Sequence, residues 1–276
     1  MKKNILGIIL SITAISTSWG DEESNVEKTS QLLERIQLKR NDEKAVIEMI
    51  PIVRCSLKPS KYEEILISQL RNTKISTDQF RIVSEKIGNL LISKVIDCLP
   101  TKNIEIETPV ARCQGKALTC KVELVSIMRA GDALLDIFLK HFPESNVSKF
   151  LIQRDEKTAK PQFKYMRVSS TIGSGSYVVI TEPMIATGGT LEMVITLLKE
   201  KGVQEENIIV AAICASPEGI LYLNQRFPKI KVVMTILDEK LNEKKFISPG
   251  LGDFGDRFFG TLNMTAKADD GAWATH

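Results

Sequence analysis

The stretch of sequence that decides the fold is YVVITEPMIATGGT, at residues 177–190. It opens with an apolar run rich in β-branched side chains, and a carboxylate, two glycines and a helical pattern follow. A buried strand that passes through a glycine-containing loop into a helix is typical of a parallel sheet covered by helices on both faces. In such sheets, ligands bind at the carboxyl ends of the strands.

The same alternation of apolar runs and amphipathic runs continues on both sides of this stretch. Strands are predicted over 122–128, 149–153, 177–181, 208–215 and 231–237, and helices over 77–99, 133–141, 190–201 and 217–226. The sequence therefore predicts an α/β fold with a central, mostly parallel sheet and helices on both faces. A separate helical segment is predicted over 26–49.

The loop that follows the central strand has the groups needed to hold a phosphosugar. Glu182, at the strand end, can hold sugar hydroxyls, and Thr187 and Thr190 supply hydroxyl donors. Gly188 and Gly189 let the backbone approach an anion at the start of a helix, where N–H groups are exposed. The loop has neither the nucleotide P-loop pattern nor the dinucleotide pattern, which argues against an ATPase and a dehydrogenase.

Two further loops are candidates for binding. In the loop at 126–132, Arg129 stands beside small residues whose N–H groups can face an oxyanion. The glycine-rich stretch at 246–261 carries Asp253 and Asp256 and offers backbone N–H and C=O groups to a planar base. A turn-rich cap without a ligand is the alternative interpretation of that stretch.

Composition excludes several classes of protein. The chain has 276 residues with a net charge of +3, and 43% hydrophobic and 26% charged residues are typical of a soluble globular protein. The weak charge gives no support to nucleic-acid binding. The five cysteines contain no C-x-x-C, and His141 and His276 lie outside the candidate loops. A structural zinc site and a Ser/His or Cys/His hydrolase are therefore not expected.

The first twenty residues have the pattern of a secretory signal. Lys2 and Lys3 precede an apolar run, and small residues and an acidic segment follow it. The run is too short to span a bilayer. An N-terminal extension or a misassigned start is the alternative interpretation.

Taken together, the three loops resemble the uracil phosphoribosyltransferase family, from about residue 70 to residue 261. Six other stretches resemble the family in order and spacing: 70–72, 76–81, 105–109, 153–158, 215–219 and 237–242. The resemblance implies the type I phosphoribosyltransferase fold with a small arm or hood, the arm falling at residues 160–170. The expected organisation is a leader at 1–20, a helical extension at 21–69, the phosphoribosyltransferase domain at 70–261 and a tail at 262–276.

The resemblance also implies an activity and partners. The activity is transfer of ribose 5-phosphate from phosphoribosyl pyrophosphate to N1 of uracil, which gives UMP and pyrophosphate, with Mg²⁺ as cofactor and no protein side chain ligating the metal directly. The expected partners are uracil, phosphoribosyl pyrophosphate and further copies of the chain, with no nucleic acid. Membrane contact is expected only through the leader, if it is retained.

Site residues follow from the resemblance position by position. Arg129, Glu182 and Asp253 are the expected catalytic residues. The phosphoribosyl pyrophosphate site is expected to comprise Arg129, Arg154, Glu182, Pro183, Met184, Ile185, Ala186, Thr187, Gly188, Gly189, Thr190 and Asp253. The uracil site is expected to comprise Ile247, Gly252, Asp253 and Phe254.

Three residues depart from the family pattern. Glu182 replaces an aspartate, Asp132 replaces an apolar residue after Arg-Ala-Gly, and Phe246 replaces a tyrosine. Two hypotheses therefore remain open: a working uracil phosphoribosyltransferase, and a catalytically weakened relative that acts as an exported or membrane-associated ligand-binding protein. The chemistry places the enzyme in the cytoplasm, whereas residues 1–20 point to export.

Overall fold

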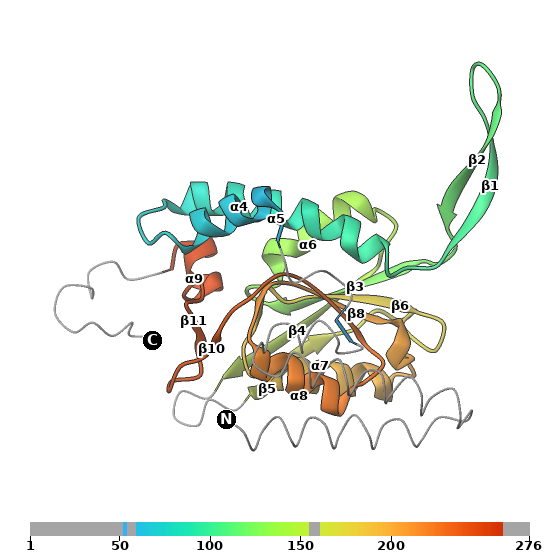
Figure 1. Ribbon diagram of the computed structural model, residues 1–276. Helices are drawn as coiled ribbons and strands as arrows, with labels where there is room; N and C mark the ends of the chain where they lie inside the picture. Colours follow the sequence, from blue (N-terminus) through green and yellow to red (C-terminus); the bar gives the residue numbers. More distant parts are fainter. Residues whose placement is uncertain (1–51, 54–58, 155–160, 262–276) are drawn as a thin grey trace, which may run out of the picture.

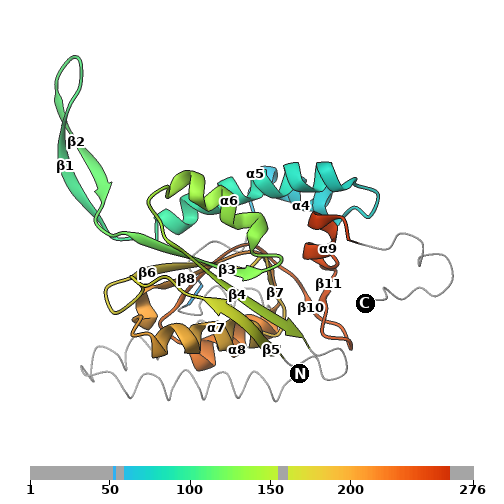
Figure 2. The same ribbon diagram turned by 180° about the vertical axis from the view of Figure 1, so that it is seen from behind.

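The computed structural model describes residues 52–53, 59–154 and 161–261. A seven-stranded sheet forms the middle layer, and helices cover both of its faces (Figure 1, Figure 2). The strands follow the order β5-β4-β3-β6-β8-β7, and β9 also pairs with β8. Their bounds are β3 (Val122–Met128), β4 (Val147–Arg154), β5 (Pro161–Arg167), β6 (Tyr177–Thr181), β7 (Met184–Ile185), β8 (Ile208–Ala215) and β9 (Lys231–Leu237). All pairs are parallel except β4 with β5.

One face of the sheet is covered by α4, α5 and α6, and the other by α7 and α8, while α9 lies beside α5 at one end (Figure 1). The helices are α4 (Lys61–Arg71), α5 (Thr77–Ile96), α6 (Asp132–His141), α7 (Gly189–Glu200), α8 (Pro217–Arg226) and α9 (Phe254–Phe259), with a short 3₁₀ turn at Glu205–Asn207. Two small hairpins complete the structure, β1 (Thr101–Glu107) with β2 (Arg112–Leu118), and β10 (Lys240–Leu241) with β11 (Ile247–Ser248).

Successive side chains of β6 point into opposite layers. Val178 and Ile180 belong to the apolar core that includes Val194 of α7, whereas Val179 belongs to the core that includes Ile87 of α5. Because side chains alternate along a strand, an unbroken apolar run fills both layers at once. Every residue of β8 is buried for the same reason. The sheet thus separates two apolar cores, one on each of its faces.

The structure confirms the predicted α/β architecture. Strands β3, β6, β8 and β9 and helix α8 have the predicted bounds, and α6 begins one residue earlier than predicted. Helix α7 begins and ends one residue earlier than predicted, and β4 extends beyond the predicted 149–153 at both ends. The predicted helix at 77–99 ends at Ile96, and Leu90 on its expected buried face is only half-buried.

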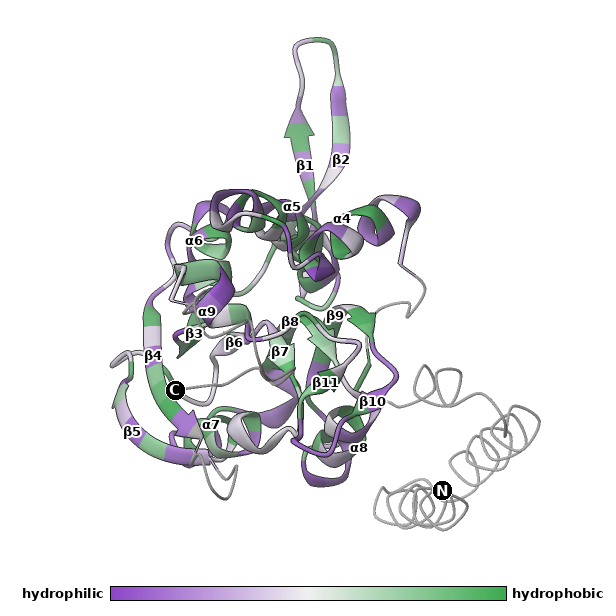
Figure 3. Cartoon of the chain, turned by 90° about the vertical axis from the view of Figure 1, so that its left-hand side faces the viewer, coloured by the Kyte–Doolittle hydropathy of each residue, from purple (hydrophilic) through white to green (hydrophobic). Residues whose placement is uncertain are grey.

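Other elements were not expected from the sequence. The β1–β2 hairpin extends away from the body of the molecule, with most of its residues exposed (Figure 3). The described part of the expected arm, residues 161–170, contains the edge strand β5, which pairs antiparallel with β4. Helix α4 spans the predicted domain boundary at residue 70, and it buries Leu66, Ile67 and Leu70 in the core that it shares with α5.

The predicted leader, the predicted helical segment at 26–49 and the predicted tail lie outside the described residues. Within the described ranges, no helix combines the length and apolar character needed to cross a bilayer. Val53 forms a parallel bridge to Val232 of β9, and Ile52 beside it is fully buried. The chain therefore joins the sheet before α4 begins.

Candidate active site

The three predicted loops meet at the carboxyl ends of β3 and β6. A Cβ atom placed on Gly131 would lie 2.3 Å from the carbonyl oxygen of Thr181, so the loop after β3 lies directly against the end of β6. A Cβ atom on Gly255 would lie 3.8 Å from that of Ala130, so the start of α9 lies beside the same loop. The structure thus brings the loops at 126–132, 182–190 and 246–261 to one edge of the sheet.

The loop between β6 and α7 ends in a turn that strongly favours glycine. Gly188 has a φ of +81°, and a Cβ atom there would lie 3.0 Å from Cδ1 of Tyr222 and 3.2 Å from the carbonyl oxygen of Gly219. Gly188 is also the N-cap of α7, so it has no side chain to cap the first N–H groups of this helix. Such a helix start attracts an anion, because its N–H groups and the helix dipole both favour negative charge.

Glu182 lies half-buried at the end of β6. Its backbone N–H donates to the carbonyl of Ala211 at 3.1 Å, and its Oε1 accepts from the N–H of Met184 at 3.4 Å. The longer side chain thus turns back toward its own loop. The carboxylate stays at the strand end, where the sequence predicts a contact with sugar hydroxyls.

Arg129 connects the loop after β3 with α9. Its Nη2 lies 2.6 Å from Oδ1 of Asp256, and its Nη1 donates to Oγ1 of Thr261 at 3.2 Å. The side chain of Arg129 is 54% exposed, so this ion pair is open to solvent. The peptide bond between Met128 and Arg129 is cis. A guanidinium at this position can form bidentate hydrogen bonds with two oxygens of a phosphate group.

Asp132 is neutralised by a residue that sequence reasoning missed. Lys149 Nζ on β4 lies 3.1 Å from Oδ2 of Asp132, and Ser126 Oγ donates to Oδ1 at 2.5 Å. The ammonium group offsets the like-charge repulsion that Asp132 would otherwise exert on an anionic ligand. The available signal was a lysine inside the otherwise apolar strand segment at 149–152.

The segment at 246–254 is a sequence of tight turns. Its peptide bond between Ser248 and Pro249 is cis, and Gly250 and Gly252 both have positive φ. Asp253 caps α9, because its Oδ1 accepts from the N–H of Asp256 at 2.8 Å. The side chain of Phe254 is buried and packs edge-on against Phe80, with ring centroids 5.1 Å apart. Its backbone alone is therefore available to a ligand.

Arg154 is a predicted donor-site residue, and Phe246 is one of the three departures from the family pattern. Arg154 is the last residue of β4, and its side chain lies outside the described part of the structure. Phe246 is 37% exposed, and its N–H donates to Oδ1 of Asn242 at 2.9 Å. Within residues 52–53, 59–154 and 161–261, no group of three His, Cys, Asp or Glu side chains is placed to hold a metal ion.

A family model described as uracil phosphoribosyltransferase matches residues 59–261. The chain belongs to this family. A uracil phosphoribosyltransferase of Dictyostelium discoideum is 41% identical over 200 residues, which are 71% of this chain and 91% of the relative. One from Lactococcus lactis subsp. cremoris is 38% identical over 196 residues, which are 71% and 92% of the two chains. A solved structure of a protein from Aquifex aeolicus covers 75% of this chain and 97% of its own, at 27% identity and a TM-score of 0.65.

Membership of the uracil phosphoribosyltransferase family fits the α/β sheet described above and gives it the type I phosphoribosyltransferase fold. Three contacts around the site were not foreseen from the sequence. They are the Asp132–Lys149 pair, the Arg129–Asp256 pair and a buried pair between Arg71 and Asp238. Each pairing depends on how separate elements pack together, so the sequence around either residue does not identify its partner.

Proposed function

We propose that this chain transfers ribose 5-phosphate from phosphoribosyl pyrophosphate to N1 of uracil, giving UMP and pyrophosphate. The observation that carries the proposal is the convergence of three loops at one sheet edge: an arginine beside small residues, a strand-end carboxylate followed by an uncapped helix start, and a turn-rich backbone segment. These are the groups needed for pyrophosphate, ribose phosphate and a planar base. Family membership supports the same activity.

We propose the following roles for the residues. Arg129 and Arg154 bind the pyrophosphate, and Glu182 holds the ribose hydroxyls. The backbone and hydroxyl groups of 183–190 bind the 5′-phosphate, as expected for a loop that leads into the N-terminus of α7. The backbone groups of Ile247, Gly252 and Phe254 face uracil, and Asp253 faces the pyrophosphate.

The proposed reaction needs no covalent nucleophile on the protein. Displacement at C1 of ribose passes through an oxocarbenium-like transition state, so neutralising the leaving pyrophosphate and holding the base in line are the main requirements. Arg129 supplies positive charge, and the tight turns around Gly250 and Gly252 hold the base-binding backbone in place. The pair of Asp132 with Lys149 keeps an added carboxylate from repelling the donor.

Mg²⁺ is proposed to arrive with the pyrophosphate. Asp253 is exposed, and its Oδ2 has no hydrogen-bond partner among the described residues, so it can face a hydrated cation. Mg²⁺ prefers carboxylate, phosphate and water oxygens, which fits this single carboxylate better than a cage of protein ligands. When bound, the ion supplies charge neutralisation on the leaving group.

We also propose that the chain forms a homo-oligomer, does not bind nucleic acid and contacts a membrane only through its N-terminal leader. The second candidate function is a ligand-binding protein with weakened activity. Glu182, which is longer than the aspartate expected there, favours that candidate because its carboxylate turns back onto Met184. Both candidates predict donor binding, and only the first predicts UMP.

The test is an assay of radiolabelled uracil conversion to UMP by the chain without residues 1–20, with phosphoribosyl pyrophosphate and Mg²⁺. We expect UMP to form only when uracil, phosphoribosyl pyrophosphate and Mg²⁺ are all present. Thermal stabilisation by the donor without UMP formation would favour the binding protein, because a ligand of the folded state alone raises the melting temperature. Neither stabilisation nor UMP would contradict both candidates.

A further inference from the structure

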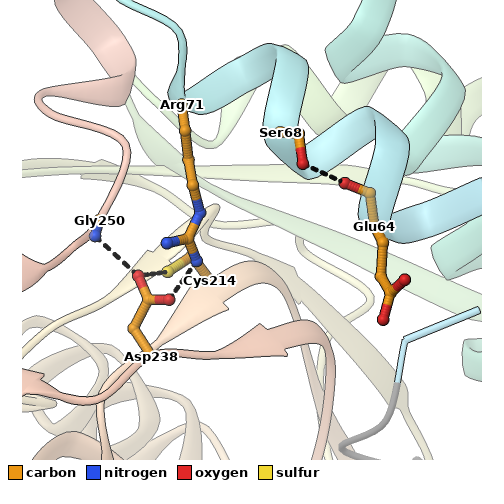
Figure 4. Close-up of polar contacts among 6 residues, drawn as sticks. All are labelled: Glu64, Ser68, Arg71, Cys214, Asp238 and Gly250. Carbon is orange, nitrogen blue, oxygen red and sulfur yellow. Dashed lines mark hydrogen bonds and ion pairs between the residues drawn. The ribbon is translucent and has the colours of Figure 1, made fainter. Parts of the chain in front are cut away.

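The C-terminal end of α4 lies against the segment proposed to bind uracil (Figure 4). Arg71, the last residue of α4, forms an ion pair with Asp238, which directly follows β9. Oδ2 of Asp238 accepts from the N–H of Gly250 at 2.8 Å and from the thiol of Cys214 at 3.2 Å. One carboxylate thus connects α4, β8 and the turn at 248–252.

The ion pair between Arg71 and Asp238 is largely shielded from solvent. The side chain of Asp238 is 2% exposed and that of Arg71 is 25% exposed. A buried carboxylate without a counter-charge is strongly disfavoured, so the position of Asp238 depends on Arg71. Burial and the charge of Asp238 also raise the pKa of the Cys214 thiol well above its ordinary value, so this group stays a neutral donor.

Gly250 can reach Asp238 only through an unusual backbone geometry. Its φ is +63°, and a Cβ atom there would lie 2.2 Å from the carbonyl oxygen of Ile247. The turn is therefore closed tightly enough to exclude any side chain at this position. Its N–H points at Asp238, so the carboxylate holds the turn that separates Ile247 from Gly252.

A second arginine ties the next residue to the same helix end. Nη1 of Arg257 donates to the carbonyl of Leu251 at 2.6 Å and to that of Leu70, and its Nη2 donates to the carbonyl of Asn72 at 2.8 Å. The guanidinium lies over the ring of Phe80, 4.5 Å from its centroid. Gly250 is thus connected to Arg71 through Asp238, and Leu251 is connected to Leu70 and Asn72 through Arg257. The proposed reaction assigns no other role to residues 70–72.

We propose that Arg71 and Asp238 are positioning residues that set the affinity for uracil. They act through the N–H of Gly250 by fixing the spacing of the backbone groups of Ile247 and Gly252. The inference rests on the proposed function, because it requires this segment to bind the base. Among the described residues, the polar contacts of these two side chains are with each other, Cys214 and Gly250, none of which is a proposed donor residue, so we expect their removal to affect one substrate and spare the other.

The kinetic test compares Asp238→Asn with Glu63→Gln. Glu63 is also a residue of α4, and it forms an ion pair with Lys94 of α5. The side chains of Glu63 and Lys94 are 8% and 25% exposed. This control pair joins α4 to α5 and does not contact residues 247–254. Asp238→Asn should raise the KM for uracil about tenfold or more and change the KM for phosphoribosyl pyrophosphate less than about twofold, because the charged acceptor of the Gly250 N–H becomes a neutral amide and Arg71 loses its counter-charge. Glu63→Gln should change neither KM. Equal changes in both KM values for Asp238→Asn would overturn the proposal.

A second comparison uses Arg71. Arg71→Lys keeps the positive charge and should restore part of the uracil affinity that Arg71→Gln loses. A lysine variant as impaired as the glutamine variant, with the donor KM raised in parallel, would assign Arg71 to general stability.

Amide hydrogen exchange tests the positioning without any activity. In the unchanged protein the N–H of Gly250 should exchange about tenfold or more slowly than that of the exposed Gly252, because opening it requires breaking the bond to Asp238. Equal exchange at the two glycines would overturn the proposal even where no variant folds. If the unchanged protein makes no UMP but protects Gly250, the proposed function fails, and the positioning is then tested on uracil binding measured by calorimetry.

Discussion

Lys149 Nζ lies 3.1 Å from Oδ2 of Asp132, and the two residues belong to neighbouring elements beside the Arg129 loop. Lys149 projects from β4, opposite Ser126 of β3, and Asp132 is the first residue of α6. The hydroxyl of Ser126 donates to the same carboxylate. An acidic residue next to an anion site is therefore accompanied by its own counter-charge.

The first prediction concerns this pair. Lys149→Met should weaken binding of phosphoribosyl pyrophosphate by about tenfold, because it leaves the negative charge of Asp132 uncompensated near an anionic ligand. The double variant with Asp132→Leu should regain most of that loss. Calorimetry with Mg²⁺ present measures both, and strictly additive effects would show that the two residues act independently.

The second prediction concerns Arg129. Arg129→Ala should lower turnover by about 10²-fold or more and weaken donor binding, because a charge partner of the leaving group is lost. The melting temperature should hardly change, since the side chain is 54% exposed. Asp256→Asn is the matched control: it removes the partner of Arg129 and keeps the guanidinium, so turnover should be affected far less. Full activity of the alanine variant would assign Arg129 to structure.

The third prediction separates the two candidate functions at Glu182. In a working enzyme, Glu182→Asp should leave activity similar or modestly lower, and Glu182→Ala should cost roughly 1.5 to 3 kcal/mol of donor binding, the range for a hydrogen bond to a charged group. In a weakened relative, Glu182→Asp combined with Asp132→Leu should instead raise donor affinity or create UMP synthesis. Unchanged donor binding in both single variants would show that Glu182 does not face the ribose.

The fourth prediction concerns the choice of base. Backbone groups fixed for uracil leave partners unpaired against the amino group of cytosine, at roughly 1 to 3 kcal/mol for each unpaired group. Uracil should therefore be accepted, and cytosine and purines rejected, in competition assays of UMP formation. Equal turnover of cytosine would contradict the assignment of residues 247–254 to the base.

The fifth prediction concerns acid stability and Glu63. Burial raises the pKa of this carboxyl, but the hydrogen bond from Lys94 and those from Ser60 outweigh it, so the net pKa is below the ordinary value of 4.5. A carboxyl with a lowered folded-state pKa stabilises the fold above its unfolded pKa and loses that contribution as the pH falls through the folded value. Melting temperatures measured from pH 7 to pH 3 should therefore fall less steeply below pH 4.5 in Glu63→Gln than in the unchanged chain. Parallel curves would show that Glu63 does not contribute.

The sequence predicted the sheet well because its strands are continuous apolar runs. β6 and β8 are buried on both sides, so composition alone marks them. The β1–β2 hairpin was missed because its exposed strands carry no such signal. Helix α4 lies mostly within the predicted helical extension at 21–69, but its bounds were not predicted, although it begins with a capping box in which Ser60 and Glu63 each bond the other's backbone N–H. That Ser-x-x-Glu pattern was the available signal.

The site was predictable only as far as its loops. Their glycines and strand-end carboxylate follow from local chemistry, whereas the ion pairs around them depend on tertiary contacts. Asp256 and Arg129 are an example, because the pairing depends on how α9 packs beside the loop after β3. The roles of the individual residues stay predictions.

The bridge between Val53 and Val232 limits how far this chain can be truncated from its N-terminus. Ile52 is fully buried, and its carbonyl accepts from the N–H of Val232 at 2.6 Å, so these two residues cover part of the outer side of β9. A recombinant chain that starts at residue 59, where the family match begins, would uncover that strand edge and invite pairing with another molecule. A truncated chain that keeps this contact must therefore begin at or before Ile52.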